Sequence, residues 1–185
     1  MTGRRERTKA ANRAALLVAA RDAFGTLGYE AAAVRDIVRR TDLASGTFYN
    51  YFPDKDAVFR AVVEEAGAEA RRRVRAARTA AATFPEFVEA GYRAYFTFIV
   101  EDPATFAFLH RNVHVLGLGA EVPLGAQELA EDLRTLGHAD VDYAAHAMVA
   151  VGVELGARLA QRDPPDVEGA TRFATDLLLR GLPQP

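Results

Sequence analysis

Apolar residues recur every three or four positions along most of the chain, and no segment alternates β-branched and polar residues. The first spacing places apolar side chains on one face of a helix, whereas alternation is typical of a strand. The sequence therefore predicts an all-α protein. Its first helix is predicted over residues 8–27, because Gly28 follows the last apolar position and can end the helix in a left-handed conformation.

The N-terminal third contains three more predicted helices. The second covers residues 34–40, and the third covers residues 45–52, SGTFYNYF. Pro53 ends the third helix, since a proline disfavours helical geometry at the residue before it. Asp54 can then cap a long fourth helix that reaches about Arg78. The arginines late in this fourth helix are expected on its solvated face; they are Arg71, Arg72, Arg73, Arg75 and Arg78.

Capping signals mark the rest of the chain as helical too. Thr83 and Glu86 form a capping-box pattern for a fifth helix, and Asp102 followed by Pro103 begins a sixth. Residues 117–125, GLGAEVPLG, are predicted to be a loop. Glycines and prolines then bound three last helices, at about 124–136, 141–161 and 166–180.

The second and third helices, separated by the segment TDLAS, form a helix-turn-helix pattern. In this motif the second helix enters the major groove of DNA and the first crosses the backbone. Phe48 and Phe52 fall on one helical face and are expected in the core. The residues around them are expected to face outward: Thr47, Tyr49, Asn50 and Tyr51.

These outward residue types are suited to DNA. Hydroxyl groups donate hydrogen bonds to phosphate oxygens, and an asparagine can read adenine. Ser45 and Gly46 begin the third helix, where free backbone N–H groups favour a phosphate. The candidate DNA-binding residues are Arg35, Ser45, Gly46, Thr47, Tyr49, Asn50, Tyr51 and Lys55.

Charge is distributed unevenly, although the net charge is only −2. Residues 1–55 carry ten basic and six acidic side chains, whereas residues 56–185 carry thirteen and nineteen. Such asymmetry is typical of a chain that meets a polyanion at one end. Arg4, Arg5 and Arg7 form a basic arm that either contacts DNA or is a solvated terminus.

Composition excludes several other classes. The chain has no cysteine, so it has no disulfide, no thiolate zinc site and no cysteine nucleophile. Its start lacks the apolar core of a signal peptide, and no apolar run approaches the about 18 residues of a membrane span. A soluble, cytoplasmic protein with no membrane partner, no cofactor and no catalytic activity is expected.

The segments FGTLGYEAAAVRDIVRR and TDLASGTFYNYFPDKDAVFRAVVE resemble the DNA-binding domain of the TetR family of bacterial transcriptional regulators. The resemblance covers about residues 8–65 and implies the same DNA contacts named above. It also implies a homodimer with an all-helical effector-binding domain. We therefore expect a DNA-binding domain over residues 1–53, and an effector-binding and dimerisation domain over residues 54–185. Ala32 and Ala33 stand where the family usually has threonine, so one phosphate contact and a helix cap are expected to be missing. Asp42 stands where the family usually has a turn glycine, and its negative charge is unfavourable near DNA unless it points away.

The segment from Phe84 to Leu116 is rich in aromatic residues, which line either a small-molecule pocket or an ordinary core. Two histidines one helical turn apart make only a weak metal site, and no metal is expected. They can instead hydrogen-bond an effector. The candidate ligand-binding residues are Tyr92, Tyr95, Phe96, Phe98, Phe106, His110 and His114.

Small residues follow one another at helical spacing in the segment 141–161, where another helix could approach closely. This stripe either packs within one subunit or forms a dimer face together with the last helix. The candidate interface residues are Ala145, Val149, Gly152, Gly156, Phe173 and Leu177.

Together these features predict a repressor that binds a palindromic double-stranded DNA operator as a homodimer and is released by a small-molecule effector. One alternative is a constitutive DNA-binding protein whose C-terminal domain only dimerises. The other is an all-α enzyme that uses His110, His114 or Glu154, which no nucleophile, phosphate loop or carboxylate pair supports.

Overall fold

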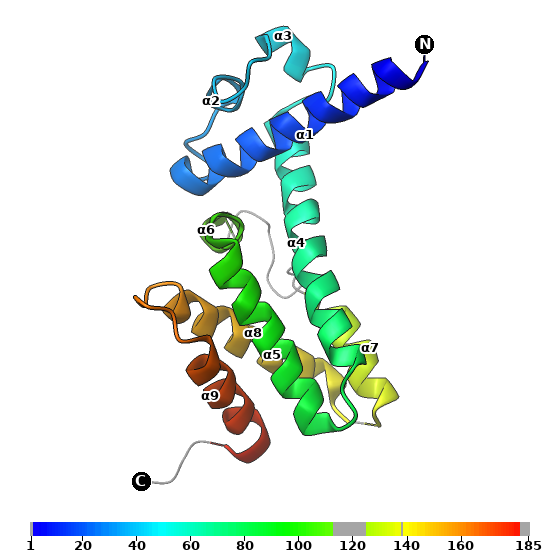
Figure 1. Ribbon diagram of the computed structural model, residues 1–185, viewed down its shortest axis with the longest axis vertical. Helices are drawn as coiled ribbons and strands as arrows, with labels where there is room; N and C mark the ends of the chain where they lie inside the picture. The colour runs from blue at the N-terminus through cyan, green and yellow to red at the C-terminus, as the bar shows by residue number, and fades with distance from the viewer. Residues whose placement is uncertain (1, 113–124, 138, 182–185) are drawn as a thin grey trace. The chain divides into compact units, whose positions relative to one another are not determined.

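The computed structural model of the protein describes residues 2–112, 125–137 and 139–181. Within these ranges the chain forms nine helices and no strand (Figure 1), which confirms the all-α prediction. The helices are α1 Thr2–Leu27, α2 Val34–Val38, α3 Ser45–Phe48, α4 Lys55–Thr79, α5 Phe84–Glu101, α6 Pro103–Asn112, α7 Ala126–Thr135, α8 Val141–Leu159 and α9 Val167–Arg180.

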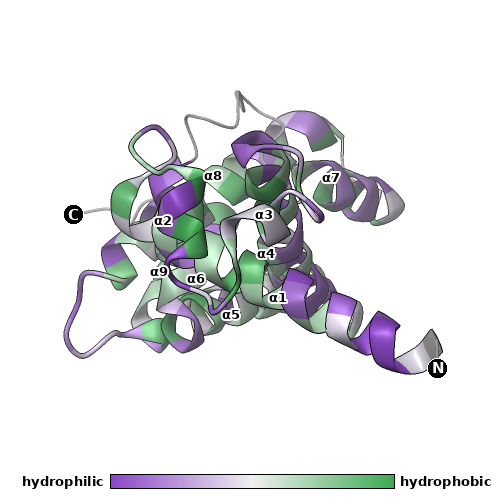
Figure 2. Cartoon of the chain, turned by 90° about the horizontal axis from the view of Figure 1, so that it is seen from above, coloured by the Kyte–Doolittle hydropathy of each residue, from purple (hydrophilic) through white to green (hydrophobic). Residues whose placement is uncertain are grey.

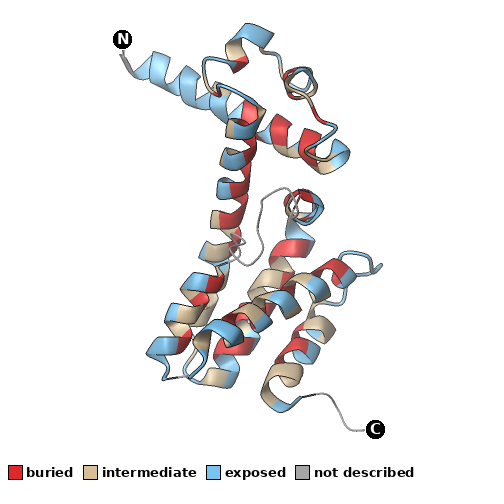
Figure 3. Ribbon diagram, turned by 180° about the vertical axis from the view of Figure 1, so that it is seen from behind, coloured by how far each residue is buried: buried red, intermediate tan, exposed pale blue. Residues whose placement is uncertain are grey.

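Helix α1 begins six residues earlier than predicted. Its first turns are rich in Arg, Lys and Ala, which favour helical structure, and the side chain of Arg7 donates to the carbonyl of Gly3 at 2.9 Å. These turns are hydrophilic and exposed (Figures 2 and 3). The basic arm is therefore a helical extension of α1.

The described residues form two compact units. One contains residues 2–66 and 104–112, and we call it the headpiece unit. The other contains residues 67–103, 125–137 and 139–181, and we call it the C-terminal unit. The headpiece unit is larger than the segment 1–53, because it includes the first turns of α4 and most of α6, of which Phe108 lies in its core.

An aromatic cluster lies at the centre of the headpiece unit. The ring of Phe24 on α1 lies 5.9 Å from that of Tyr29, 5.1 Å from that of Phe59 and 6.3 Å from that of Phe108. Three of these rings are buried, and burying each apolar side chain contributes about 1.5–3 kcal/mol. This cluster joins α1, α4 and α6.

The C-terminal unit is built around α5, which packs against α8 and α9, while α8 also packs against α7 and α9. Gly152 on α8 faces α5, and a Cβ atom there would lie 3.4 Å from the ring of Tyr92, an ordinary van der Waals distance. Tyr92 donates a hydrogen bond to the carbonyl of Met148 at 2.9 Å. Arg93 on α5 forms ion pairs with Glu89 and with Glu168 on α9.

Candidate nucleic-acid interface

The α3 segment presents one aromatic residue outward and two inward. Phe48 and Phe52 are buried in the headpiece core, with ring centroids 5.9 Å apart. Tyr49 is 59% exposed and Asn50 is exposed. Tyr51 was expected to face outward, but it is half-buried and packs against the core, so less of its side chain is exposed to a partner.

The regular part of α3 is shorter than the predicted span of 45–52. It ends at Phe48 and continues as turns, in which Asn50 and Tyr51 donate to the carbonyls of Thr47 and Phe48. Pro53 has no backbone N–H to donate to the carbonyl of Tyr49, so a helix cannot run on from these turns into α4.

Ser45 and Gly46 are exposed at the start of α3. A Cβ atom built on Gly46 would have no described atom within 4 Å, so the packing of the chain itself does not require glycine there. The backbone of this turn is therefore open to approach from outside.

Lys55, the first residue of α4, is held in place by Tyr29. Its Nζ donates to the carbonyl of Tyr29 at 2.9 Å and lies 4.1 Å from the centroid of the Tyr29 ring. The hydroxyl of Tyr29 donates to the carboxylate of Asp56, which together with burial raises the pKa of Tyr29 to about 12. An ammonium group has three donors, so Lys55 retains donors for a phosphate.

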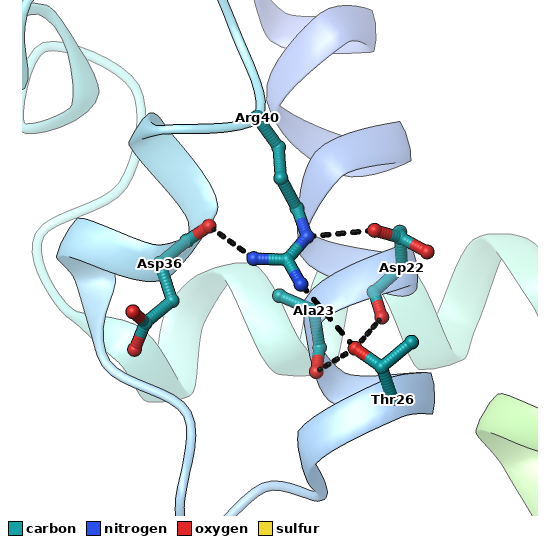
Figure 4. Close-up of polar contacts among 5 residues, drawn as sticks. All are labelled: Asp22, Ala23, Thr26, Asp36 and Arg40. Carbon is teal, nitrogen blue, oxygen red and sulfur yellow. Dashed lines mark hydrogen bonds and ion pairs between the residues drawn. The ribbon is translucent and has the colours of Figure 1, made fainter.

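Arg40 fixes α2 against α1 (Figure 4). Its Nε lies 2.6 Å from a carboxylate oxygen of Asp22, and its other nitrogens donate to the carbonyl of Asp36 at 2.7 Å and to the hydroxyl of Thr26 at 3.4 Å. The planar guanidinium can make these bonds at once because its donors point in fixed directions. Arg40 thus positions the helix-turn-helix, a role that the sequence alone did not suggest.

The start of α2 shows how the chain manages without a threonine cap. Ala33 occupies the cap position and has no side-chain acceptor, but the carboxylate of Asp36 accepts from the N–H of Ala33 at 2.9 Å. Ala32 is buried. Arg35, the candidate contact residue of α2, has a side chain that is 77% exposed.

Asn112 at the end of α6 connects this helix to the candidate interface. Its side-chain oxygen accepts from the N–H of Tyr29 at 2.8 Å, and its side-chain nitrogen donates to the carbonyls of Phe24 at 3.2 Å and Phe108 at 2.8 Å. Asn112 is fully buried. The sequence analysis gives Asn112 no role, although a single amide side chain at the end of an aromatic-rich helix could have indicated a buried hydrogen-bonding residue.

The candidate ligand-binding residues are divided between the two units. Tyr92, Tyr95, Phe96 and Phe98 lie on α5 in the C-terminal unit, where Tyr92, Phe96 and Phe98 are core residues and Tyr95 borders a small hollow. Phe106 and His110 lie on α6 in the headpiece unit, with ring centroids 5.5 Å apart. His114 lies outside the described residues.

The candidate dimer residues divide into covered and exposed ones. Ala145, Gly152 and Gly156 are already buried within the single chain, so they offer a partner almost no surface. Val149 and Leu177 are half-buried and Phe173 is 46% exposed.

None of the described helices has both the length and the apolar character needed to cross a membrane. Nor do the described residues bring together three or more potential metal ligands.

Comparison with known proteins identifies the region that contains α2, α3 and the start of α4. Residues 16–62 match the family model for bacterial regulatory proteins of the tetR family. No match is found among curated protein sequences.

Solved structures of regulators share the fold along nearly the whole chain. The fatty acid degradation regulator FadR from Bacillus halodurans has a TM-score of 0.80 and 20% identity, covering 94% of this chain and 97% of its own. FadR from Bacillus subtilis in complex with stearoyl-CoA has a TM-score of 0.75 and 17% identity, covering 91% and 98%. A TetR-family transcriptional regulator from Pectobacterium atrosepticum has a TM-score of 0.67 and 26% identity, covering 94% of both chains.

Proposed function

We propose that this chain, whose residues 16–62 match the tetR family model, is a cytoplasmic transcriptional repressor that binds a palindromic operator as a homodimer and is released by a small-molecule effector. The observation that carries the DNA-binding part is the α3 segment, which buries Phe48 completely while Tyr49 beside it remains largely exposed. An exposed tyrosine next to an exposed asparagine at the end of a basic headpiece is suited to a duplex.

Residues of the headpiece have separate roles in this proposal. Tyr49 and Lys55 contact phosphates and set the register, whereas Asn50 reads a base edge in each half-site. Two headpieces about 34–36 Å apart reach successive major grooves on one side of the duplex. The dimer that brings them together is proposed to use exposed apolar residues of α8 and α9, among them Phe173.

Release by an effector follows from linkage. A ligand that binds better to a conformation with the headpieces at the wrong spacing weakens DNA binding by the same factor, commonly 5-fold to 150-fold. Within the headpiece unit, Asn112 contacts the N–H of Tyr29, whose carbonyl holds Lys55. A shift of α6 would therefore move Tyr29 and, through it, Lys55, which is proposed to contact a phosphate.

An acyl-CoA is the first effector class to test, because the FadR of similar fold from Bacillus subtilis was solved in complex with stearoyl-CoA. A panel of thioesters and other metabolites would be added to the protein bound to operator DNA. A ligand that releases the DNA supports the repressor; operator binding that no ligand changes would favour the constitutive DNA-binding alternative.

The DNA-binding test uses fluorescence anisotropy with the DNA upstream of the coding region of this protein. Tyr49→Ala and Lys55→Ala should weaken binding to all sequences, whereas Asn50→Ala should relax base preference at one position of each half-site. Arg72→Ala, which removes a 71% exposed side chain from the C-terminal unit outside α8 and α9, is the control. If all three headpiece variants bind like wild type, the proposed interface is wrong.

A further inference from the structure

Two arginines of the α4 cluster, Arg71 and Arg78, are half-buried instead of exposed. Arg72 and Arg73 lie on the surface of α4 as expected, and each forms an ion pair with Glu69. Arg78 contradicts the expectation, because its Nε is inaccessible and no residue within the described ranges accepts a hydrogen bond from it. Burial lowers the pKa of Arg78 below its ordinary value.

The surroundings of Arg78 hold the guanidinium in a fixed place. Its central carbon lies 5.3 Å from the centroid of the Phe87 ring on α5. A Cβ atom on Gly91 would lie only 2.7 Å from Nε, so this glycine provides the space into which the side chain fits. The carboxylates of Asp132 and Glu128 attract the guanidinium from further away, and neither forms a salt bridge with it.

Arg78 is half-buried, and an enclosed guanidinium Nε without a hydrogen-bond acceptor is a costly arrangement. Perturbed ionisable groups of this kind are concentrated at binding sites, where the ligand supplies the missing partner. The position of Arg78 therefore raises the question of which anion completes it.

Arg78 borders a cleft of about 280 Å³ within the C-terminal unit. The cleft is formed by the end of α4, the start of α5 and the end of α7, and we call it the Arg78 cleft. Its lining combines apolar side chains with hydroxyl groups and one carboxylate, and includes Arg78, Thr83, Phe84, Phe87, Asp132 and Leu136. The rings of Phe84 and Phe87 are stacked, with centroids 6.3 Å apart.

The charges around Arg78 define what the cleft can accept. Arg78 and Asp132 also border a second, smaller hollow of about 30 Å³, to which Arg71, Arg75 and Glu128 contribute. Arg71, Arg75 and Glu128 do not line the Arg78 cleft, whose described charged residues are Arg78 and Asp132. Arg71 and Glu128 already form an ion pair at 3.5 Å. The guanidinium of Arg78 can therefore pair with one carboxylate of a ligand.

We infer that the Arg78 cleft binds a small organic monocarboxylate. The carboxylate accepts hydrogen bonds from the guanidinium of Arg78, and the apolar body of the ligand packs against Phe84, Phe87 and Leu136. The cleft is slightly smaller than the about 300–1,000 Å³ typical of drug-sized ligands, which favours a compact molecule. Any effect of this ligand on DNA rests on the proposed function, whereas the binding itself does not.

The test is isothermal titration calorimetry of the full chain, without DNA, with benzoate, hexanoate and the uncharged benzamide. Benzoate or hexanoate is expected to bind, and benzamide at least about 10-fold more weakly than benzoate. Arg78→Met should weaken carboxylate binding by at least about 10-fold. Arg72→Met removes an exposed arginine from the same helix and should leave the affinity unchanged.

Two further measurements separate a binding role from a structural one. Arg78→Met should raise the melting temperature of the ligand-free protein, because it removes an enclosed Nε that has no hydrogen-bond acceptor within the described residues. Asp132→Asn keeps Arg78 and removes a repelling carboxylate, so it should tighten binding of the carboxylates even if Arg78→Met does not fold.

No binding of either carboxylate, equal binding of benzoate and benzamide, or unchanged affinity in a folded Arg78→Met variant would each overturn the inference. Weaker carboxylate binding by Asp132→Asn, or a lower melting temperature for ligand-free Arg78→Met, would count against it as well. Failure of the wild-type protein to bind DNA would refute the proposed function. It would not affect the inference that the Arg78 cleft binds a carboxylate, because the titrations contain no DNA.

Discussion

Replacing Asn112 with leucine removes three hydrogen bonds from the headpiece unit but leaves only one group without a partner. The carbonyl of Phe24 still accepts from the N–H of Gly28 at 3.0 Å. The carbonyl of Phe108 can still accept within α6. The N–H of Tyr29 loses its acceptor, and a buried group without its partner costs about 1–3 kcal/mol.

We therefore expect Asn112→Leu to lower the free energy of unfolding by about 2 kcal/mol. For a chain of this size, this loss corresponds to a fall of about 4–8 °C in melting temperature. Urea denaturation and thermal melts measure both quantities, and hydrogen exchange at the Tyr29 amide reports the local effect. His110→Leu is the matched control, since His110 is exposed on the same helix and its replacement should cost no more than about 0.5 kcal/mol.

Asn112→Asp tests the same site without changing its shape. Aspartate keeps an acceptor for Tyr29, but it brings a carboxylate oxygen against the carbonyls of Phe24 and Phe108. Burial and these carbonyls should raise the folded-state pKa of the new carboxyl above its unfolded value. The variant should then be relatively more stable at acid pH and lose stability as pH rises. An Asn112→Leu variant as stable as His110→Leu, or an Asn112→Asp variant without this pH dependence, would refute the reasoning.

Three other changes probe the headpiece. Gly46→Ala should keep or slightly raise the melting temperature, since a Cβ has open space there, yet weaken operator binding in anisotropy titrations if DNA approaches this backbone. Tyr29→Phe should lower stability in urea melts at pH 8. The raised pKa of Tyr29, about 12, means that the wild-type advantage is complete below pH 10 and lost by about pH 12. Arg40→Ala should cost about 1 kcal/mol of stability, because the bonds it removes are partly exposed, and Arg40→Lys should restore only part of the loss in the same melts.

Helix positions could be predicted wherever local chemistry sets them. Thr83 caps α5 as predicted, with its hydroxyl accepting from the N–H of Glu86 at 3.4 Å. Asp166 caps α9 through a bond from the N–H of Gly169 at 2.8 Å. The end of α3 was less well predicted, because periodicity continues through Phe52 although the backbone changes to turns after Phe48.

The partner of each helical face could not be predicted, because periodicity assigns a side chain to a face and does not identify the neighbour. Gly152 was open to two interpretations from the sequence, within one subunit or between two. The structure covers it with the rings of Tyr92 and Tyr95 of the same chain. The neighbour of Arg78 could not be predicted either. The sequence shows a charged residue in a basic run, and nothing in that pattern indicates that its Nε is enclosed beside Gly91.

Asn112 and Arg78 are both polar residues covered by the fold, and they differ in whether their polar atoms have partners. All the bonds that Asn112 makes are to backbone groups of its own unit, so its removal should destabilise the protein whether or not a ligand is present. Arg78 has a donor with no described acceptor, so its removal should stabilise the free protein and weaken only the bound state. Apolar replacements at the two sites should therefore change stability in opposite directions, which distinguishes a residue that positions the headpiece from one that is completed by a ligand.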